Sequence, residues 1–133
     1  MSTLFTQIID GDIPSHEIYE DEFTYAFLDV NPRQEGHALV VPRAEVDYLF
    51  DLPDEDYKAL WRAVRTVADG LREATGCARV VLIVVGYEVP HAHVHLIPTN
   101  ELRDVPFPPV DADAQGRLEE TAERIRAVLQ PRS

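Results

Sequence analysis

The stretch 91-HAHVHLIP-98 places His91, His93 and His95 at every second position of the chain. Every second side chain of a β-strand points to the same face, so the spacing predicts three imidazole rings on one side of a strand. The whole chain holds only 5 histidines, which makes the alternation unusual. Imidazoles in a row can bind a metal, hold a ligand, or attack an electrophile near neutral pH.

The residues alone leave four interpretations of the three rings open. They can be structural histidines, although three in strict alternation rarely lack a task. They can form a metal site, but four residues of strand separate the outer backbones by roughly 13–14 Å. One zinc ion with Zn–N bonds of about 2.0–2.1 Å cannot join all three, and only His16 and His37 could add nitrogen ligands. They can also line a binding pocket that performs no chemistry.

The fourth interpretation, which we favour, is nucleophilic and acid–base chemistry at a phosphorus centre. A neutral imidazole can attack through one nitrogen while a partner fixes the proton on the other. The flanking rings can then hydrogen-bond the phosphoryl oxygens. His93 is the natural nucleophile because it has an imidazole on each side.

The composition is that of an acidic globular chain, expected to fold as a single domain over residues 1–133. It carries 24 Asp and Glu against 12 Lys and Arg, a formal net charge of -12. Such a surface repels nucleic acid polymers and anionic membranes, so neither is expected as a partner. Cys77 is alone, which excludes an internal disulfide. Residues 1–10 lack the features of a signal peptide, and no apolar run approaches a membrane span, so a cytoplasmic location is expected.

Hydrophobic patterning predicts an α+β fold with a mainly antiparallel sheet, one long helix and a C-terminal helix. The helix over 53–75 shows apolar residues at helical spacing, begins at Pro53 and ends at Gly76. A proline-rich connector over 104–111 leads to the last helix, whose apolar face is formed by Leu118, Ala122, Ile125 and Leu129. The expected strands cover 23–30, 37–41, 79–85 and 91–98, and the expected second helix covers roughly 116–129.

Several motifs together resemble the histidine triad (HIT) superfamily, in its Hint-like branch. They are 4-LFTQIIDGDIPSHEIYED-21, 27-FLDVNPRQEGHALVVP-42 and the His-x-His-x-His run, which occur in the family's order and spacing over about residues 4–98. The resemblance implies a homodimer of α+β subunits, with residues 99–133 forming the connector and C-terminal helix.

The resemblance also implies an activity: binding a purine nucleoside monophosphate derivative and cleaving a bond to its α-phosphorus, with no cofactor. By the family pattern His93 is the nucleophile that forms a nucleotidyl-histidine, His91 and His95 flank it, and His37 supports them. Asp29 accepts hydrogen bonds from the ribose, or alternatively caps the turn at Asn31. The wall around the base is assigned to Phe5, Ile8 and Phe27, for which ordinary core packing is the alternative.

Two departures from the family pattern alter what is expected. Many members bind a structural zinc through Cys-x-x-Cys, a later histidine and the first triad histidine. This chain has Thr3, Thr6 and Glu45 at those three positions, so no structural zinc is expected.

The second departure is in 86-GYEVP-90, where Tyr87 and Glu88 replace the Gln and Ser/Thr that usually donate hydrogen bonds to phosphate. Tyr87 can still donate, whereas an ionised Glu88 accepts only and repels phosphate. Glu88 either points away, paired with Arg33 or Arg43, or stays protonated and acts as general acid. We favour the first.

The leading hypothesis is therefore a nucleotide phosphoramidase or nucleoside-phosphate hydrolase. The rival is a nucleotide-binding module with little turnover. The sequence does not identify the base, the leaving group or the physiological substrate.

Overall fold

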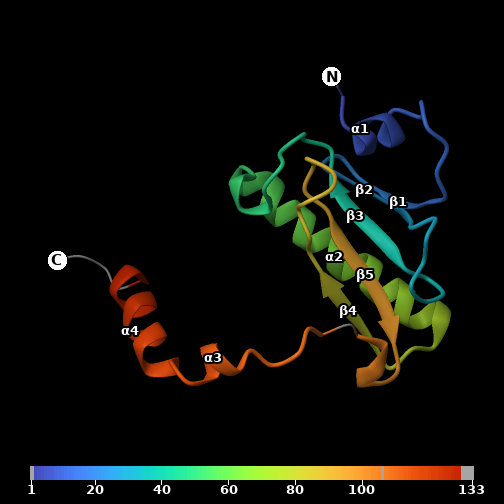
Figure 1. Cartoon of the computed structure of the whole chain (residues 1–133). Coiled ribbons are helices and arrows are strands. Elements are labelled where there is room, and N and C mark those ends of the chain that lie inside the picture. The colour runs from blue at the N-terminus through green and yellow to red at the C-terminus, as the bar shows by residue number, and fades with distance from the viewer. Residues whose placement is uncertain (1, 106, 130–133) are drawn as a thin grey trace.

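The computed structural model describes residues 2–105 and 107–129, which form one sheet flanked by helices and a C-terminal arm (Figure 1). The expected α+β class with an antiparallel sheet is confirmed. The strands are β1 (Glu17–Glu20), β2 (Thr24–Leu28), β3 (Ala38–Pro42), β4 (Arg79–Ile83) and β5 (Val94–Thr99). The α-helices are α1 (Leu4–Ile9), α2 (Asp54–Thr75), α3 (Ala112–Gln115) and α4 (Leu118–Leu129), and the short 3-10 turns are η1 (Leu49–Asp51) and η2 (Leu102–Asp104).

The sheet has the strand order β1-β2-β3-β5-β4, and each neighbouring pair is antiparallel. Its register lines up four residues across the sheet: Phe27 opposite Leu39, Leu39 opposite His95, and His95 opposite Ile83. Directly opposed side chains of neighbouring strands lie on the same face. This row therefore places the third triad histidine beside the apolar residues of β2 and β3.

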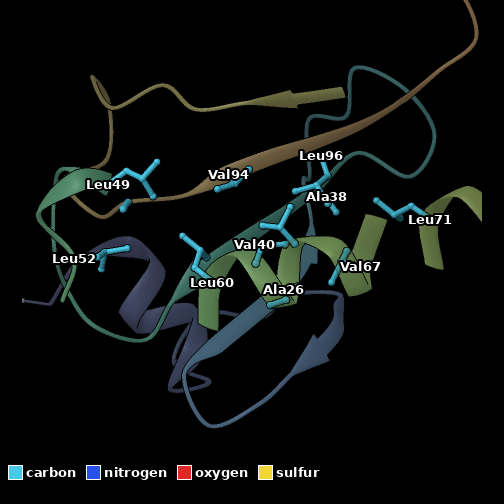
Figure 2. Close-up of a cluster of buried hydrophobic side chains, with 13 residues drawn as sticks. Ala26, Ala38, Val40, Leu49, Leu52, Leu60, Val67, Leu71, Val94 and Leu96 are labelled. Atoms are coloured by element: carbon cyan, nitrogen blue, oxygen red, sulfur yellow. The ribbon is translucent and has the colours of Figure 1, made fainter. Parts of the chain in front are cut away.

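Helix α2 covers the other face of the sheet (Figure 1). Its buried residues pack against small and branched residues of β2, β3 and β5, as Figure 2 shows. The buried face of α2 comprises Ala59, Leu60, Ala63, Val64, Val67 and Leu71. Three other apolar residues follow the same helical spacing but are only partly buried, at the flank of this face: Tyr57, Trp61 and Ala68. The helix ends at Gly76 in the left-handed conformation, as its sequence predicts.

A second cluster lies on the triad side of the sheet. Phe5 and Ile8 of α1 pack there with residues of β2 and β3. Neither α1 nor the edge strand β1 was predicted from the sequence. Both are short, 6 and 4 residues, so each contains only about two repeats of its hydrophobic pattern. Helix α1 begins with Thr3, whose hydroxyl accepts the Thr6 amide at 3.1 Å, an N-cap visible in the sequence.

The strand expected over 91–98 is shorter at its start, and this corrects the picture of three equivalent rings. Strand β5 begins at Val94, and its pairing with β3 ends at the Val40–Val94 pair. Pro42 has no N–H to continue the ladder, and its carbonyl is taken by the His91 ring. His91 and His93 therefore lie in the segment before β5. Two other strands are also shorter than predicted, since β4 ends at Ile83 and β2 spans only Thr24–Leu28.

The C-terminal segment leaves the sheet as an arm (Figure 1). Its helix starts at Leu118, after the separate turn α3, and none of its residues is buried. The predicted C-terminal helix is present, but its apolar face is not covered by the described part of the chain: Leu118, Ile125 and Leu129 are 67%, 52% and 74% exposed. Helical spacing shows that these residues share a face, but it does not show what covers that face. The single-domain assignment of 1–133 stays a prediction, and Met1, Pro106 and 130–133 lie outside the described residues.

Candidate active site

A cavity of about 520 Å3 opens on the triad side of the sheet. One wall is apolar and includes Phe5, Ile8 and Phe27, the three residues expected around a base. The phenyl rings of Phe5 and Phe27 lie 5.8 Å apart and are buried. The polar residues at the cavity are Ser15, Asp29, Asn31, Arg33, His37, Glu88, His93 and His95. A small organic ligand with an apolar and a charged end fits such a site.

His93 is held by the main chain of its neighbour in the triad. Its Nδ1 lies 2.8 Å from the carbonyl oxygen of His91, which can only accept, so Nδ1 donates. In the neutral ring the other nitrogen, Nε2, then carries a lone pair and no proton. No hydrogen bond to Nε2 occurs within the described part of the chain. His93 is thus a buried but cavity-lining imidazole with an unprotonated nitrogen available for attack.

His95 is held by a contact with His37. The Arg33 amide donates to His37 Nδ1 at 3.0 Å, so the proton of neutral His37 is on Nε2. That atom lies 3.0 Å from His95 Nδ1, which must accept. The His95 proton is therefore on Nε2, opposite to the arrangement in His93. Burial, together with the neighbouring His93, lowers the pKa of His95 to about 4, so the ring is neutral at pH 7.

His91 takes no part in lining the cavity and is fully buried. Its Nε2 lies 2.7 Å from the carbonyl of Pro42, and its Nδ1 lies 2.7 Å from the hydroxyl of Thr3. Burial lowers its pKa. The flanking role expected for His91 stays a prediction, although its ring does not line this cavity. His91 contacts the residues of the cavity through its carbonyl oxygen and through Phe5, whose ring packs 5.7 Å from His91 and 4.8 Å from His93.

Asp29 makes the turn-capping contact considered for it, and its expected role toward ribose stays a prediction. Its Oδ1 accepts the Asn31 amide at 2.8 Å, which is the turn-capping role, while the residue also lines the cavity. Its Oδ2 lies 3.5 Å from His37 Nε2 and 4.0 Å from His95 Nδ1. These three groups could surround a metal ion. A metal would need both Nε2 of His37 and Nδ1 of His95 unprotonated, but the Arg33 amide places the His37 proton on Nε2. The three groups are therefore better satisfied by the proton on His37 Nε2 than by a metal ion.

The loop before the triad places its two substitutions differently. Tyr87 is 96% exposed and does not line the cavity, so its expected role as a phosphate donor is not supported by its position. Glu88 does line the cavity. Arg43, one of its two expected partners, instead binds Glu20 at 3.3 Å, and no ion pair to Glu88 occurs within residues 2–105 and 107–129. A carboxylate thus borders the space beside His93 and His95.

The Thr3, Thr6 and Glu45 side chains, at the positions where many family members hold zinc, come together beside His91. Threonine hydroxyls are not among the usual zinc ligands. The Thr3 hydroxyl already binds His91 Nδ1, the ring nitrogen that faces this cluster. These residues do not fit a structural zinc, and the cluster is held by hydrogen bonds instead.

The chain is similar to known proteins over most of its length. The model of the HIT domain family matches residues 10–102. This chain belongs to the histidine triad (HIT) family. This HIT protein is 34% identical over 102 residues to the purine nucleoside phosphoramidase of Escherichia coli, covering 71% of this chain and 85% of the relative. It is 32% identical over 121 residues to the adenosine 5'-monophosphoramidase of Saccharomyces cerevisiae, covering 86% and 77%.

A solved structure has the same fold. A crystal structure of a HIT family protein from Bacillus subtilis matches this HIT protein with a TM-score of 0.82, 30% identity and 100% coverage of both chains. The likeness therefore includes the C-terminal part of the chain.

Sequence reasoning missed several residues of the site. Thr3 was considered only as a lost zinc ligand, yet it hydrogen-bonds His91. The Arg33 amide, which sets the His37 tautomer, carries no side-chain signal at all. Leu39, which also lines the cavity, could have been found, because it lies two positions from His37 in a predicted strand and so shares a face with it.

Proposed function

We propose that this HIT protein is a nucleotide phosphoramidase or nucleoside-phosphate hydrolase that works through a nucleotidyl-His93 intermediate. The observation that carries the proposal is the His93 ring, whose Nδ1–H is tied to the His91 carbonyl at 2.8 Å. This leaves Nε2 unprotonated beside a cavity with an apolar wall and a polar mouth. Two relatives named as phosphoramidases support the reaction class.

The geometry supports two displacements at the α-phosphorus. In the first, the Nε2 lone pair of His93 forms a bond to phosphorus as the bond to the leaving amine or oxygen breaks, and the leaving group takes up a proton. In the second, water attacks phosphorus and loses a proton, the bond to His93 breaks, and the nucleoside monophosphate leaves. The Nε2–H of His95 would donate to a phosphoryl oxygen during both steps. The Nδ1–H bond of His93 would stabilise the positive charge on its ring.

The remaining contacts of the substrate follow from the lining of the cavity. The Phe5, Ile8 and Phe27 wall is suited to a purine base. The Asp29 carboxylate, free at Oδ2 apart from the histidine pair, is suited to ribose hydroxyls. The rival function, nucleotide binding with little turnover, is favoured by Glu88, whose carboxylate would repel a phosphate at close range.

The decisive experiment is a covalent trap. The protein is mixed with adenosine 5'-phosphoramidate, quenched rapidly and analysed by intact-protein mass spectrometry. We expect a gain of one adenylyl group, mapped by peptide analysis to His93. His93→Asn should abolish the adduct and lower turnover at least about 1000-fold, while the matched control His16→Asn, at an exposed histidine that does not line the cavity, should keep both. Nucleotide binding without adduct or turnover would establish the rival function.

We also propose that two copies associate as a homodimer. Strand β4 is an edge strand with Leu82 43% exposed, and it continues into the exposed Val84 and Val85. On α2, the Trp61 indole N–H is buried with no acceptor in the described part of the chain. The exposed apolar residues of the C-terminal arm likewise lack cover in a single chain. A second copy would supply contacts for all three.

The location proposed for the protein is the cytoplasm. Within the described residues, no helix is both long enough and apolar enough to cross a bilayer. The lone Cys77 is buried and free, as is usual where thiols stay reduced.

A further inference from the structure

The N-terminal end of α1 makes a direct contact with the triad. The Thr3 hydroxyl lies 2.7 Å from Nδ1 of His91, a residue 88 positions away in the sequence. On the opposite side of the ring, Nε2 lies 2.7 Å from the Pro42 carbonyl. Both ring nitrogens of His91 are thus engaged by short hydrogen bonds inside the protein.

The location of the His91 proton follows from these two partners. The Pro42 carbonyl can only accept, so Nε2 must donate. A neutral imidazole has one N–H, which leaves Nδ1 with a lone pair. The Thr3 hydroxyl must then donate to it. Burial keeps the ring neutral by lowering the pKa of His91.

Thr3 has two acceptors within reach of its one hydroxyl proton: Nδ1 of His91 at 2.7 Å and the Thr6 hydroxyl at 3.2 Å. The Thr3 amide donates to Glu45 Oε1 at 2.8 Å, and the Thr3 hydroxyl oxygen accepts the Thr6 amide at 3.1 Å. The Thr6 hydroxyl and the Thr3 amide hold the pKa of the Glu45 carboxyl below its ordinary value, so Glu45 stays an acceptor. We assign the Thr3 proton to the shorter contact, because Nδ1 of His91 can only accept.

We propose that Thr3 is a positioning residue for the reaction at His93. Its hydroxyl donates to Nδ1 of His91, in keeping with the Nε2–H tautomer that the Pro42 carbonyl requires, and so holds the ring from its second side and fixes the direction of the His91 carbonyl. That carbonyl is the acceptor that keeps the proton of His93 on Nδ1 and its lone pair on Nε2. A chain of contacts thus runs from the Thr3 hydroxyl, through the His91 ring and the His91 carbonyl, to the His93 ring that carries the attacking nitrogen. The kinetic part of this inference rests on the proposed function, whereas the tautomer part does not.

The kinetic test compares Thr3→Val, which keeps the shape but removes the donor, with Thr3→Ser, which keeps the donor. Thr66→Val is the matched control, since Thr66 is exposed on α2 and its hydroxyl bonds only within the helix. We expect Thr3→Val to lower kcat on the order of tenfold with KM changed less than about twofold, because outer hydrogen-bond partners commonly matter by this much. Thr3→Ser should stay within about threefold of the parent in kcat.

The second measurement is the nitrogen-15 NMR spectrum of the His91 ring, assigned with His91→Asn. It separates positioning from helix capping, because a lost cap alone would not remove the hydrogen bond at Nδ1 of His91. We expect the Nε2–H form in the parent, Thr3→Ser and Thr3→Val proteins, since all three keep the Pro42 carbonyl, and a shifted Nδ1 resonance in Thr3→Val only.

Two results would overturn the inference: a parent His91 that carries its proton on Nδ1, or a Thr3→Val protein with the parental kcat and the parental Nδ1 resonance. If the parent protein has no turnover at all, the proposed function fails, and the NMR result still decides the tautomer claim.

Discussion

The Nε2 atom of His37 lies 3.0 Å from Nδ1 of His95, joining two residues 58 positions apart. Because the Arg33 amide occupies the other nitrogen of His37, this contact forces the proton of His95 to face away from His37. His93 and His95 thus offer complementary nitrogens, one with a lone pair and one with a proton. Such a pair is suited to attack a phosphorus atom and to hold an oxygen on it.

The first prediction concerns His37. Replacing it with Phe keeps a buried ring but removes the donor to His95, so His95 can adopt either tautomer. We expect kcat for a nucleoside phosphoramidate to fall about 10- to 100-fold with a smaller change in KM. Steady-state kinetics measure the effect, with His16→Phe as the matched control. An unchanged kcat would show that the His37–His95 contact has no role in turnover.

The second prediction concerns Asp29. If its carboxylate accepts hydrogen bonds from ribose, Asp29→Ala should raise KM for a ribonucleotide substrate more than for its 2',3'-dideoxy analogue. Loss of one charged hydrogen bond corresponds to roughly a 10- to 100-fold effect. Because Asp29 also caps the turn at Asn31, thermal unfolding is measured beside the kinetics. An equal rise for both substrates would restrict Asp29 to the structural role.

The third prediction concerns Glu88. If its carboxylate is only a repulsive neighbour of the phosphate, Glu88→Gln should leave turnover equal or raise it, and the gain should shrink at high salt as charges are screened. The largest gain is expected for substrates with anionic leaving groups. If turnover instead collapses while the pH profile loses its limb for a required acid, Glu88 is the general acid. Glu101→Gln, a change of the same kind outside the cavity, is the control.

The fourth prediction is a loss of stability in acid. Burial lowers the pKa values of His37, His91 and His95, the last to about 4 from an ordinary value of 6.5. Between these two pH values the unfolded chain binds protons that the folded chain refuses, so the free energy of unfolding falls as pH falls. Each such proton contributes a slope of at most about 1.4 kcal/mol per pH unit.

Urea denaturation between pH 7.5 and pH 4 measures this slope. His95→Asn should reduce it relative to the parent protein, whereas His16→Asn should leave it unchanged. Identical slopes in all three proteins would mean that burial does not hold the His95 ring neutral.

The fifth prediction concerns assembly. We expect the parent protein to sediment as a dimer in analytical ultracentrifugation, and Leu82→Glu to shift it to monomer by placing a charge on the β4 edge. Leu102→Glu, another exposed leucine, is the control for added charge. A second comparison removes residues 107–133: a weaker dimer would show that the arm takes part in association. A monomeric parent protein at high concentration would contradict the proposal.

Local patterns in the sequence were enough to predict the α+β class and the histidine run at the centre of the candidate site. Period-two spacing in 91-HAHVHLIP-98 placed the rings of His93 and His95 next to one another, 5.2 Å apart, because alternate positions of an extended chain are neighbours on one face. The helix over 54–75 followed from its period and its end signals for the same reason, since both are properties of a short stretch of chain.

Which nitrogen of each ring carries the proton depends on partners that are distant in the sequence. The protons of His91 and His95 are set by Thr3, Pro42 and His37, which lie 88, 49 and 58 positions away in the sequence. The sequence pattern also did not show that His91 lies outside the lining of the cavity. Nor did it show that the apolar residues of the predicted helix α4 are exposed. Local pattern specifies which side chains share a face. The partner that meets that face depends on the path of the whole chain, and that path fixes the chemistry of an imidazole.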